Sequence, residues 1–118
     1  MKIEIPGLDT AKALDLYDDD MEMYMVVLRS YVANMPPTLE ILKNISSETL
    51  EDYKIKAHGI KGTSANIGAE DLRQAALKME TLAKSGDMAA LQAQNPIFIN
   101  QIETVVNNIK KWLDENDV

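Results

Sequence analysis

The sequence contains no cysteine, which excludes disulfide bonds, thiolate nucleophiles and cysteine-ligated zinc sites. Its one histidine is too few for a histidine-ligated metal site, so we expect no metal and no cofactor. The longest uninterrupted apolar run, residues 23–28, is far shorter than the roughly 20 residues of a membrane span. The N-terminal residues lack the apolar core of a secretory leader. These absences predict a cytoplasmic protein with no membrane partner.

Basic residues are also few. Lysine and arginine total 12 against 19 acidic residues, for a formal net charge of −7 at pH 7. Nucleic-acid binding relies on clustered lysine and arginine, and here these residues are scattered. The sequence contains no glycine-rich phosphate loop of Walker type and no protein-kinase signature set. We therefore expect no nucleic-acid partner and no ability to take a phosphoryl group from ATP.

Apolar residues make up 46% of the chain and recur at alternating steps of three and four, the spacing of buried helical stripes. No stretch shows the period-two alternation of a strand. A chain of 118 residues is long enough for one core, so residues 1–118 are expected to form one domain. The starting methionine and the complete helical pattern favour a free-standing domain, and the alternative is a C-terminal domain excised from a longer protein. The predicted fold is all-α, an antiparallel four-helix bundle with a short extra N-terminal helix.

Three features of the first half mark helix boundaries. A short helix is expected to follow Pro6-Gly7 and to close near Tyr17. The acidic run 18–20 lacks the alternating ligands, central glycine and distal glutamate of an EF-hand calcium loop. It is interpreted as the start of the second helix, with one aspartate as the cap. Pro36-Pro37 predicts either a kink or a break in that helix.

Glycines and an Asn-Pro pair divide the second half. Gly68 is placed to end the third helix as a left-handed cap, and the fourth helix should close near Gly86. So short a connection at Gly68 predicts an antiparallel hairpin of the third and fourth helices. Asp87 is expected to open a short helix through about Gln94, and Asn95-Pro96 to open the last helix.

The run 57–68 places the only histidine, a lysine and two interior glycines on the third helix. Beside the buried stripe of this helix lies a flanking face whose members are three or four residues apart and can reach solvent. That face consists of Lys54, His58, Lys61, Gly62 and Ala65. It combines one nucleophile with a cation and little side-chain bulk, which indicates function rather than packing.

Gly59 and Gly62 each cost a helix interior about 1 kcal/mol relative to alanine. Clearance explains that cost, because without a Cβ beside His58 the backbone of a partner protein can approach the imidazole closely. The alternative is a glycine-weakened helix that packs against a neighbouring element. The candidate partner-binding residues are Gly59, Gly62, Ala65 and Asn66.

The motif His58-x-x-Lys61-Gly62, followed by Ser64 and Gly68, resembles the signature of histidine-containing phosphotransfer (HPt) domains, the phosphocarriers of multistep two-component relays. The resemblance covers nearly the whole chain and continues through Leu72, Met79-Glu80 and the turn 85–87. It implies that Nε2 of His58 accepts a phosphoryl group from a receiver-domain aspartate and passes it to another receiver. It also implies that receiver domains are the partners and that the metal of aspartyl transfer belongs to them.

Lys61 and Glu80 are the candidate supports of His58. Lys61, about one turn away, can compensate charge on the phosphoryl oxygens. In the predicted hairpin, His58 lies ten residues before Gly68 and Glu80 twelve after it, so the two stand at similar heights. Glu80 can then accept a hydrogen bond from Nδ1, and many HPt domains place a glutamate or glutamine at that position. A solvent-exposed Glu80 without this contact is the alternative.

Two other functions also fit a helical bundle. A non-catalytic helical adaptor would bind a signalling partner and would keep that binding when phosphorylation is lost. An enzyme with His58 as general base would need convergent partners around it in a concave pocket. The spacing of His58 to Lys61 and Gly62 favours the phosphocarrier over both.

Overall fold

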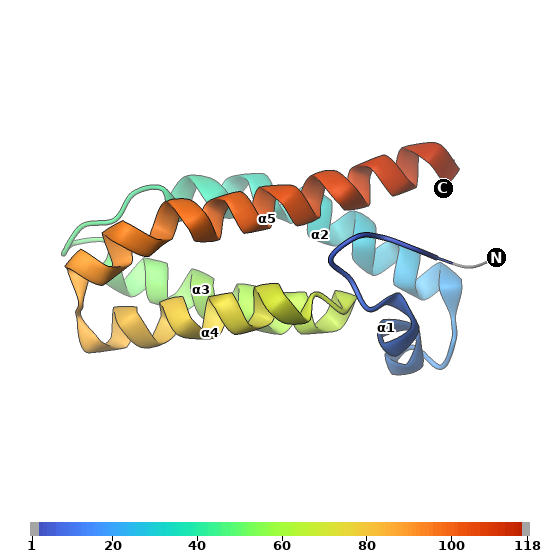
Figure 1. Cartoon of the computed structure of the whole chain (residues 1–118), viewed down its shortest axis with the longest axis horizontal. Coiled ribbons are helices and arrows are strands. Elements are labelled where there is room, and N and C mark those ends of the chain that lie inside the picture. The colour runs from blue at the N-terminus through green and yellow to red at the C-terminus, as the bar shows by residue number, and fades with distance from the viewer. Residues whose placement is uncertain (1–2, 117–118) are drawn as a thin grey trace.

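The computed structural model describes residues 3–116, which form five α-helices and, within that range, no strand. The helices are α1 (Thr10–Leu16), α2 (Met21–Leu42), α3 (Leu50–Ile67), α4 (Glu70–Ser85) and α5 (Met88–Asn116). The four long helices lie along the long axis of the molecule, and the short α1 sits at one end of them (Figure 1). The predicted all-α bundle with a short extra N-terminal helix is confirmed.

Each long helix packs against two others. α3 packs beside α2 and α4, and α5 packs beside α4 and α2. Within residues 3–116 the backbones of the diagonal pairs, α2 with α4 and α3 with α5, do not come close to each other. Two-residue turns join α3 to α4 and α4 to α5, so these neighbours run antiparallel (Figure 1). The hairpin of α3 and α4 that the sequence predicts is therefore present.

Aspartates begin three of the helices. The side chains of Asp9, Asp20 and Asp87 each accept a hydrogen bond of 3.1 Å from the backbone N–H three residues further on, at the starts of α1, α2 and α5. Each bond satisfies an amide that has no partner inside the helix. The interpretation of the acidic run 18–20 as a helix start is confirmed.

Gly68 and Gly86 end α3 and α4 in the left-handed region, with φ of +83° and +72°. Gly68 is constrained a second time, because its carbonyl accepts a hydrogen bond from the backbone N–H of Asp9 at 2.8 Å. A Cβ at position 68 would collide with the carbonyl oxygen of Asp9. The turn that sets the register of α3 and α4 is thus fixed against the N-terminal segment.

Neither proline-containing stretch interrupts its helix. α2 is continuous through Pro36-Pro37, so of the two predicted alternatives the break is wrong and the kink stays a prediction. Met35 and Leu39, on either side of the prolines, are both buried, and this packing holds the helix in place despite the lost amide donors. α5 is likewise continuous from Met88 to Asn116, so the predicted division into a short helix and a last helix is wrong.

Asn95 does not cap a helix, because its side chain belongs to the core. Its Nδ2 donates to the carbonyl of Leu42 at 2.9 Å, and its Oδ1 accepts from the hydroxyl of Tyr53 at 2.7 Å. Leu91 and Phe98, one turn before and one turn after, are both buried. The apolar stripe of α5 therefore runs across position 95 without a boundary.

All five helices contribute to one hydrophobic core. The spacing of three and four predicts a buried stripe on α3 that begins at Leu50, and Leu50 is half-buried. The rest of the stripe is confirmed, because its other five residues are buried: Tyr53, Ala57, Ile60, Ser64 and Ile67. None of the helices described is long and apolar enough to cross a membrane. With this stripe turned inward, the neighbouring positions of α3 are left at the surface of the bundle.

Candidate functional site

His58 lies on the outer side of α3, with 66% of its side chain exposed. Its helix neighbours Ala57 and Ile60 are buried, which fixes the direction in which position 58 points. Nδ1 of the ring lies 2.7 Å from Oε2 of Glu80 on α4. The hairpin therefore brings side chains from two helices into direct contact.

Glu80 is the only charged residue that is buried within residues 3–116, and only 4% of its side chain is exposed. It follows Met79, which faces the core, and its carboxylate reaches α3 rather than solvent. The alternative of a solvent-exposed Glu80 is wrong. The contact that the sequence predicts between His58 and Glu80 is present.

Two lysines approach the carboxylate of Glu80. Nζ of Lys61 lies 2.9 Å from Oε1, and Nζ of Lys84 lies 3.9 Å from Oε2. The hydrogen bond from Lys61 does most to hold the pKa of Glu80 below its ordinary value, against the opposing effect of burial. The hydrogen bond from His58 and the charge of Lys84 lower this pKa further. Glu80 is therefore ionised at neutral pH.

The ionised carboxylate fixes the state of the imidazole. An ionised carboxylate accepts hydrogen bonds and donates none, so Nδ1 of His58 must carry the proton that the pair shares. A neutral ring then has its lone pair on Nε2. Because most of the side chain is exposed, the arrangement produces an oriented nucleophile that another molecule can reach.

The glycines of α3 leave the surface beside His58 bare. A Cβ placed on Gly59 or on Gly62 would meet no atom within 4 Å. The alternative in which a neighbouring element packs on these glycines is therefore wrong for residues 3–116. Ala65 is half-buried and Asn66 is exposed. The four candidate partner-binding residues thus lie on a part of α3 that a second molecule can approach.

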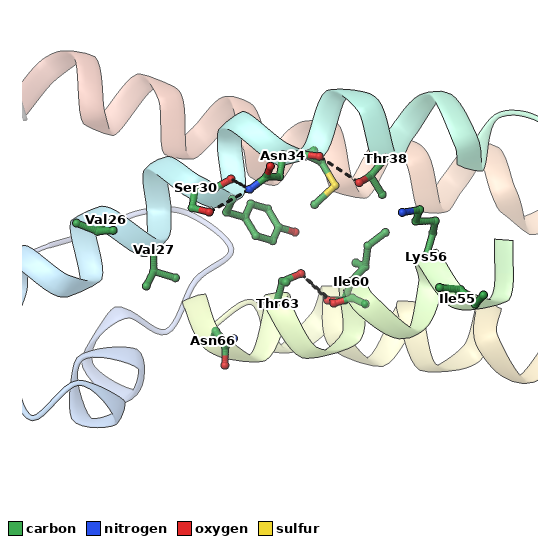
Figure 2. Close-up of a pocket in the computed structure, with 13 residues that line it drawn as sticks. Val26, Val27, Ser30, Asn34, Thr38, Ile55, Lys56, Ile60, Thr63 and Asn66 are labelled. Atoms are coloured by element: carbon green, nitrogen blue, oxygen red, sulfur yellow. Dashed lines mark hydrogen bonds between the residues drawn. The ribbon is translucent and has the colours of Figure 1, made fainter. Parts of the chain in front are cut away.

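A groove that was not predicted from the sequence runs between α2 and α3 next to these residues (Figure 2). It encloses about 530 Å³, and Lys56 is the one charged residue among those that line it. Its lining includes Val26, Val27 and Ser30 of α2 and Ile55, Gly59 and Asn66 of α3. The signal in the sequence was the apolar character of Val26 and Ile55, which lie off the buried stripes and are 55% and 54% exposed.

Among residues 3–116, no further titratable side chain makes an ion pair with His58 or Glu80. Lys54, which the sequence places on the face of His58, forms an ion pair with Glu51 at 3.0 Å. Among the residues described, no three His, Asp or Glu side chains are grouped so that they could hold a metal ion. The site consists of His58, Glu80 and the two lysines that approach it.

Comparisons with known proteins agree with this geometry. A family model described as Hpt domain matches residues 26–112, a range that begins within α2 and leaves α1 outside. The chain is 26% identical over 106 residues to the phosphorelay intermediate protein rdeA of Dictyostelium discoideum. That alignment covers 86% of this chain and 42% of rdeA, so the chain spans less than half the length of that relative. No solved structure matches the chain.

Proposed function

Because the chain belongs to the Hpt-domain family, we propose that it is a phosphocarrier of a multistep phosphorelay. It accepts a phosphoryl group on His58 from a receiver-domain aspartate and passes it to another receiver. The observation that carries this proposal is the 2.7 Å contact of Nδ1 with the buried carboxylate of Glu80. That contact orients the ring and leaves Nε2 free to attack.

The transfer forms one N–P bond and breaks one O–P bond. The lone pair of Nε2 attacks phosphorus in line with the acyl-phosphate oxygen of the donor aspartate, which leaves as a carboxylate. The proton on Nδ1 stays in place, so the ring gains positive charge as the N–P bond forms. Glu80, already ionised and in contact with Nδ1, stabilises that charge. Transfer to the next receiver follows the same steps in reverse.

Lys61 supplies the charge on the phosphoryl side. Its ammonium group carries three N–H donors, and in this structure one carboxylate oxygen of Glu80 is its partner at 2.9 Å. When a phosphoryl group occupies Nε2 of His58, the same ammonium can turn toward the phosphoryl oxygens and compensate their negative charge. Lys61 is thus the cation that we expect to stabilise both the transition state and the phosphorylated protein.

The receiver domain is proposed to dock on the bare face of α3 and on the groove beside it. Gly59 belongs to both surfaces, and the missing Cβ there lets the partner backbone come close to His58. Val26 and Ile55 supply exposed apolar area that an interface can bury. The other α3 residues of this surface are Gly62, Ala65 and Asn66.

Phosphorylation depends on the partner rather than on an activity of this chain. The sequence has no ATP-binding or kinase motif, and the relay chemistry above draws the phosphoryl group from an acyl phosphate. We therefore propose a phosphohistidine carrier, not an enzyme with its own phosphoryl donor. The cytoplasmic location expected from the sequence stays a prediction.

Phosphotransfer from receiver domains tests the proposal. The protein and its His58→Gln variant are incubated with receiver domains from the same genome that carry a radiolabelled phosphoryl group. We expect acid-labile label on the wild-type protein and none on the variant. Receiver binding without label, in a protein whose helical circular dichroism is intact, would instead support the adaptor.

A further inference from the structure

The cluster around Glu80 contains one cation more than phosphotransfer to His58 requires. We propose that Lys84 is the reserve counter-ion of Glu80, which closes on the buried carboxylate when Lys61 turns to the phosphoryl group. This inference rests on the proposed phosphorylation of His58 and adds a positioning residue to it. Lys84 acts through Glu80, and through Glu80 on the orientation of the imidazole ring.

The geometry shows two lysines in different relations to the same carboxylate. Lys61 makes a hydrogen bond of 2.9 Å to Oε1 of Glu80. Lys84 is in the last turn of α4, one turn from Glu80, and its ammonium stands 3.9 Å from Oε2, beyond hydrogen-bond distance. The side chain of Lys84 is 63% exposed, whereas that of Lys61 is 27% exposed. The ammonium of Lys84 therefore lies close to the carboxylate of Glu80, and its exposed side chain can move closer.

Phosphorylation changes what Glu80 needs. A carboxylate that is only 4% exposed must stay paired with opposite charge, because removal of one partner leaves a buried charge uncompensated. The negatively charged oxygens of the phosphoryl group compete with the carboxylate of Glu80 for the ammonium of Lys61. Glu80 must nevertheless remain ionised, since its charge balances the imidazole ring after the N–P bond has formed. A second cation that can approach resolves this conflict.

No other described cation is placed for this task. Lys54 lies on the face of His58 but pairs with Glu51 at 3.0 Å. Within residues 3–116, Lys61 and Lys84 are the lysines that come within 4 Å of Glu80. The flexible four-carbon stem of a lysine lets Lys84 shorten its distance without any change in α4.

The first test uses unphosphorylated protein and therefore does not depend on the proposed function. Lys61→Gln removes the ammonium group from Glu80 and so imitates the movement of Lys61 toward a phosphoryl group. Carboxyl ¹³C NMR measures the pKa of Glu80 in the wild type, in the single variants Lys61→Gln and Lys84→Gln, and in the double variant. We expect Lys84→Gln to raise this pKa slightly in the wild-type background and by a clearly larger shift when Lys61 is absent. Equal shifts in the two backgrounds would overturn the proposal.

Lys78 provides the matched control. It lies on the same helix and is exposed, and its side chain makes no ion pair or hydrogen bond with any residue from 3 to 116, so Lys78→Gln removes the same charge without a contact to Glu80. We expect Lys78→Gln to leave the pKa of Glu80 unchanged in both backgrounds. Lys84→Arg keeps the positive charge, so the pKa of Glu80 in this variant should equal the wild-type value. A shift from Lys78→Gln as large as that from Lys84→Gln would reduce the effect of Lys84 to general charge and overturn the proposal.

The second test measures the phosphorylated state. With a receiver domain that exchanges phosphoryl groups with the protein, the equilibrium fraction of phosphorylated His58 should fall several-fold in Lys84→Gln and stay unchanged in Lys78→Gln. An unchanged fraction in Lys84→Gln would overturn the proposal. Failure of every protein, wild type included, to take up a phosphoryl group would overturn the proposed function and the exchange of lysines with it, whatever the NMR result.

Discussion

Glu80 is the residue on which the geometry of the site depends most. Both oxygens of its buried carboxylate are occupied, one by Nδ1 of His58 and one by Nζ of Lys61. A buried carboxylate is stable only when it is paired and hydrogen-bonded. The requirement that keeps Glu80 ionised therefore also holds the imidazole ring and the ammonium group in place.

Replacement of Glu80 separates its charge from its hydrogen bond. Glu80→Ala removes both the acceptor of Nδ1 and the charge that stabilises the phosphorylated ring, and we expect the single-turnover rate of phosphotransfer to fall by about a hundredfold. Glu80→Gln keeps an acceptor of similar shape and should lose about tenfold. Quench-flow measurements with a labelled receiver give both rates. A wild-type rate in Glu80→Ala would contradict the role of this residue.

The stability of the protein should depend on pH through the same carboxylate. The pKa of Glu80 lies below its ordinary value of 4.5 in the folded protein, so the unfolded chain binds more protons between the two values. The stabilisation from Glu80 is therefore present above 4.5 and is lost as the pH falls through the folded pKa. Urea unfolding at a series of pH values should show that the free energy of unfolding falls more steeply with decreasing pH in the wild type than in Glu80→Gln. The same pH dependence in both proteins would argue against the pairing of Glu80 with His58 and Lys61.

The sequence allowed these residues to be located but not their surroundings. Counting across the turn at Gly68 puts Glu80 level with His58, because a two-residue connection sets the register of two antiparallel helices. The burial of Glu80 could not be predicted, since a glutamate next to Met79 lies at the edge of the apolar stripe. The approach of Lys84 depends on a side-chain rotamer, which spacing alone does not determine.

Among the helices, α3 combines low intrinsic stability with an open surface. A Cβ on either of its two interior glycines would meet no atom within 4 Å among residues 3–116, so no side-chain packing at these positions offsets their helical cost. The helix is held instead by its buried stripe and by α4. This combination is expected where a partner, rather than the protein itself, covers the surface.

Gly59→Ala should stabilise the protein and weaken its interaction with a receiver. The added methyl group would meet open space in the helix interior, where alanine is favoured over glycine by roughly 0.5–1 kcal/mol. The same methyl group would stand next to His58 on the proposed docking face. Chemical denaturation should show the gain in free energy of unfolding, and titration calorimetry with a receiver domain should show the loss of affinity.

Gly68→Ala is the matched contrast. Its left-handed φ of +83° and the carbonyl oxygen of Asp9 leave no room for a Cβ, so this variant should lose more than about 1 kcal/mol of stability. Destabilisation of similar size by Gly59→Ala would show that position 59 is constrained by packing, and would remove the argument for a bare docking face.

The two proline-containing helices show where local signals give way to tertiary packing. Asn95-Pro96 has the composition of a helix start, but the partners of Asn95 are the hydroxyl of Tyr53 and the carbonyl of Leu42, 42 and 53 positions away in the sequence. These buried hydrogen bonds and the continuous apolar stripe carry α5 through the proline. Local propensity cannot reveal partners at such separations, whereas the glycine caps of α3 and α4 are local and were predicted correctly.

The groove between α2 and α3 forms only when the two helices pack together in the folded protein. Periodicity predicts the buried face of each helix, and on that basis the bundle, the core stripe of α3 and the hairpin follow from the sequence. The walls of the groove are formed partly by residues outside those stripes, such as Val26 and Ile55, and their separation depends on how the two helices pack. It could therefore not be predicted without the structure.

Ile55→Ser tests the groove as part of the docking surface. The side chain is 54% exposed, so its replacement should leave the free energy of unfolding nearly unchanged. The loss of apolar contact should weaken receiver binding by about 1 kcal/mol, measured by titration calorimetry. Ile97→Ser is the matched control, since Ile97 is 59% exposed on α5 and does not line the groove. Equal effects of the two variants on binding would exclude the groove from the interface.

The position of phosphorus on the imidazole ring tests the central claim most directly. Protein with ¹⁵N-labelled histidine is phosphorylated by a receiver domain, and ³¹P–¹⁵N NMR identifies the nitrogen that bears the phosphoryl group. We expect phosphorus on Nε2 of His58, with Nδ1 protonated and still bonded to Glu80. Phosphorus on Nδ1 would require the ring to leave Glu80, and that result, or stable label on any other residue, would contradict the role assigned to this site.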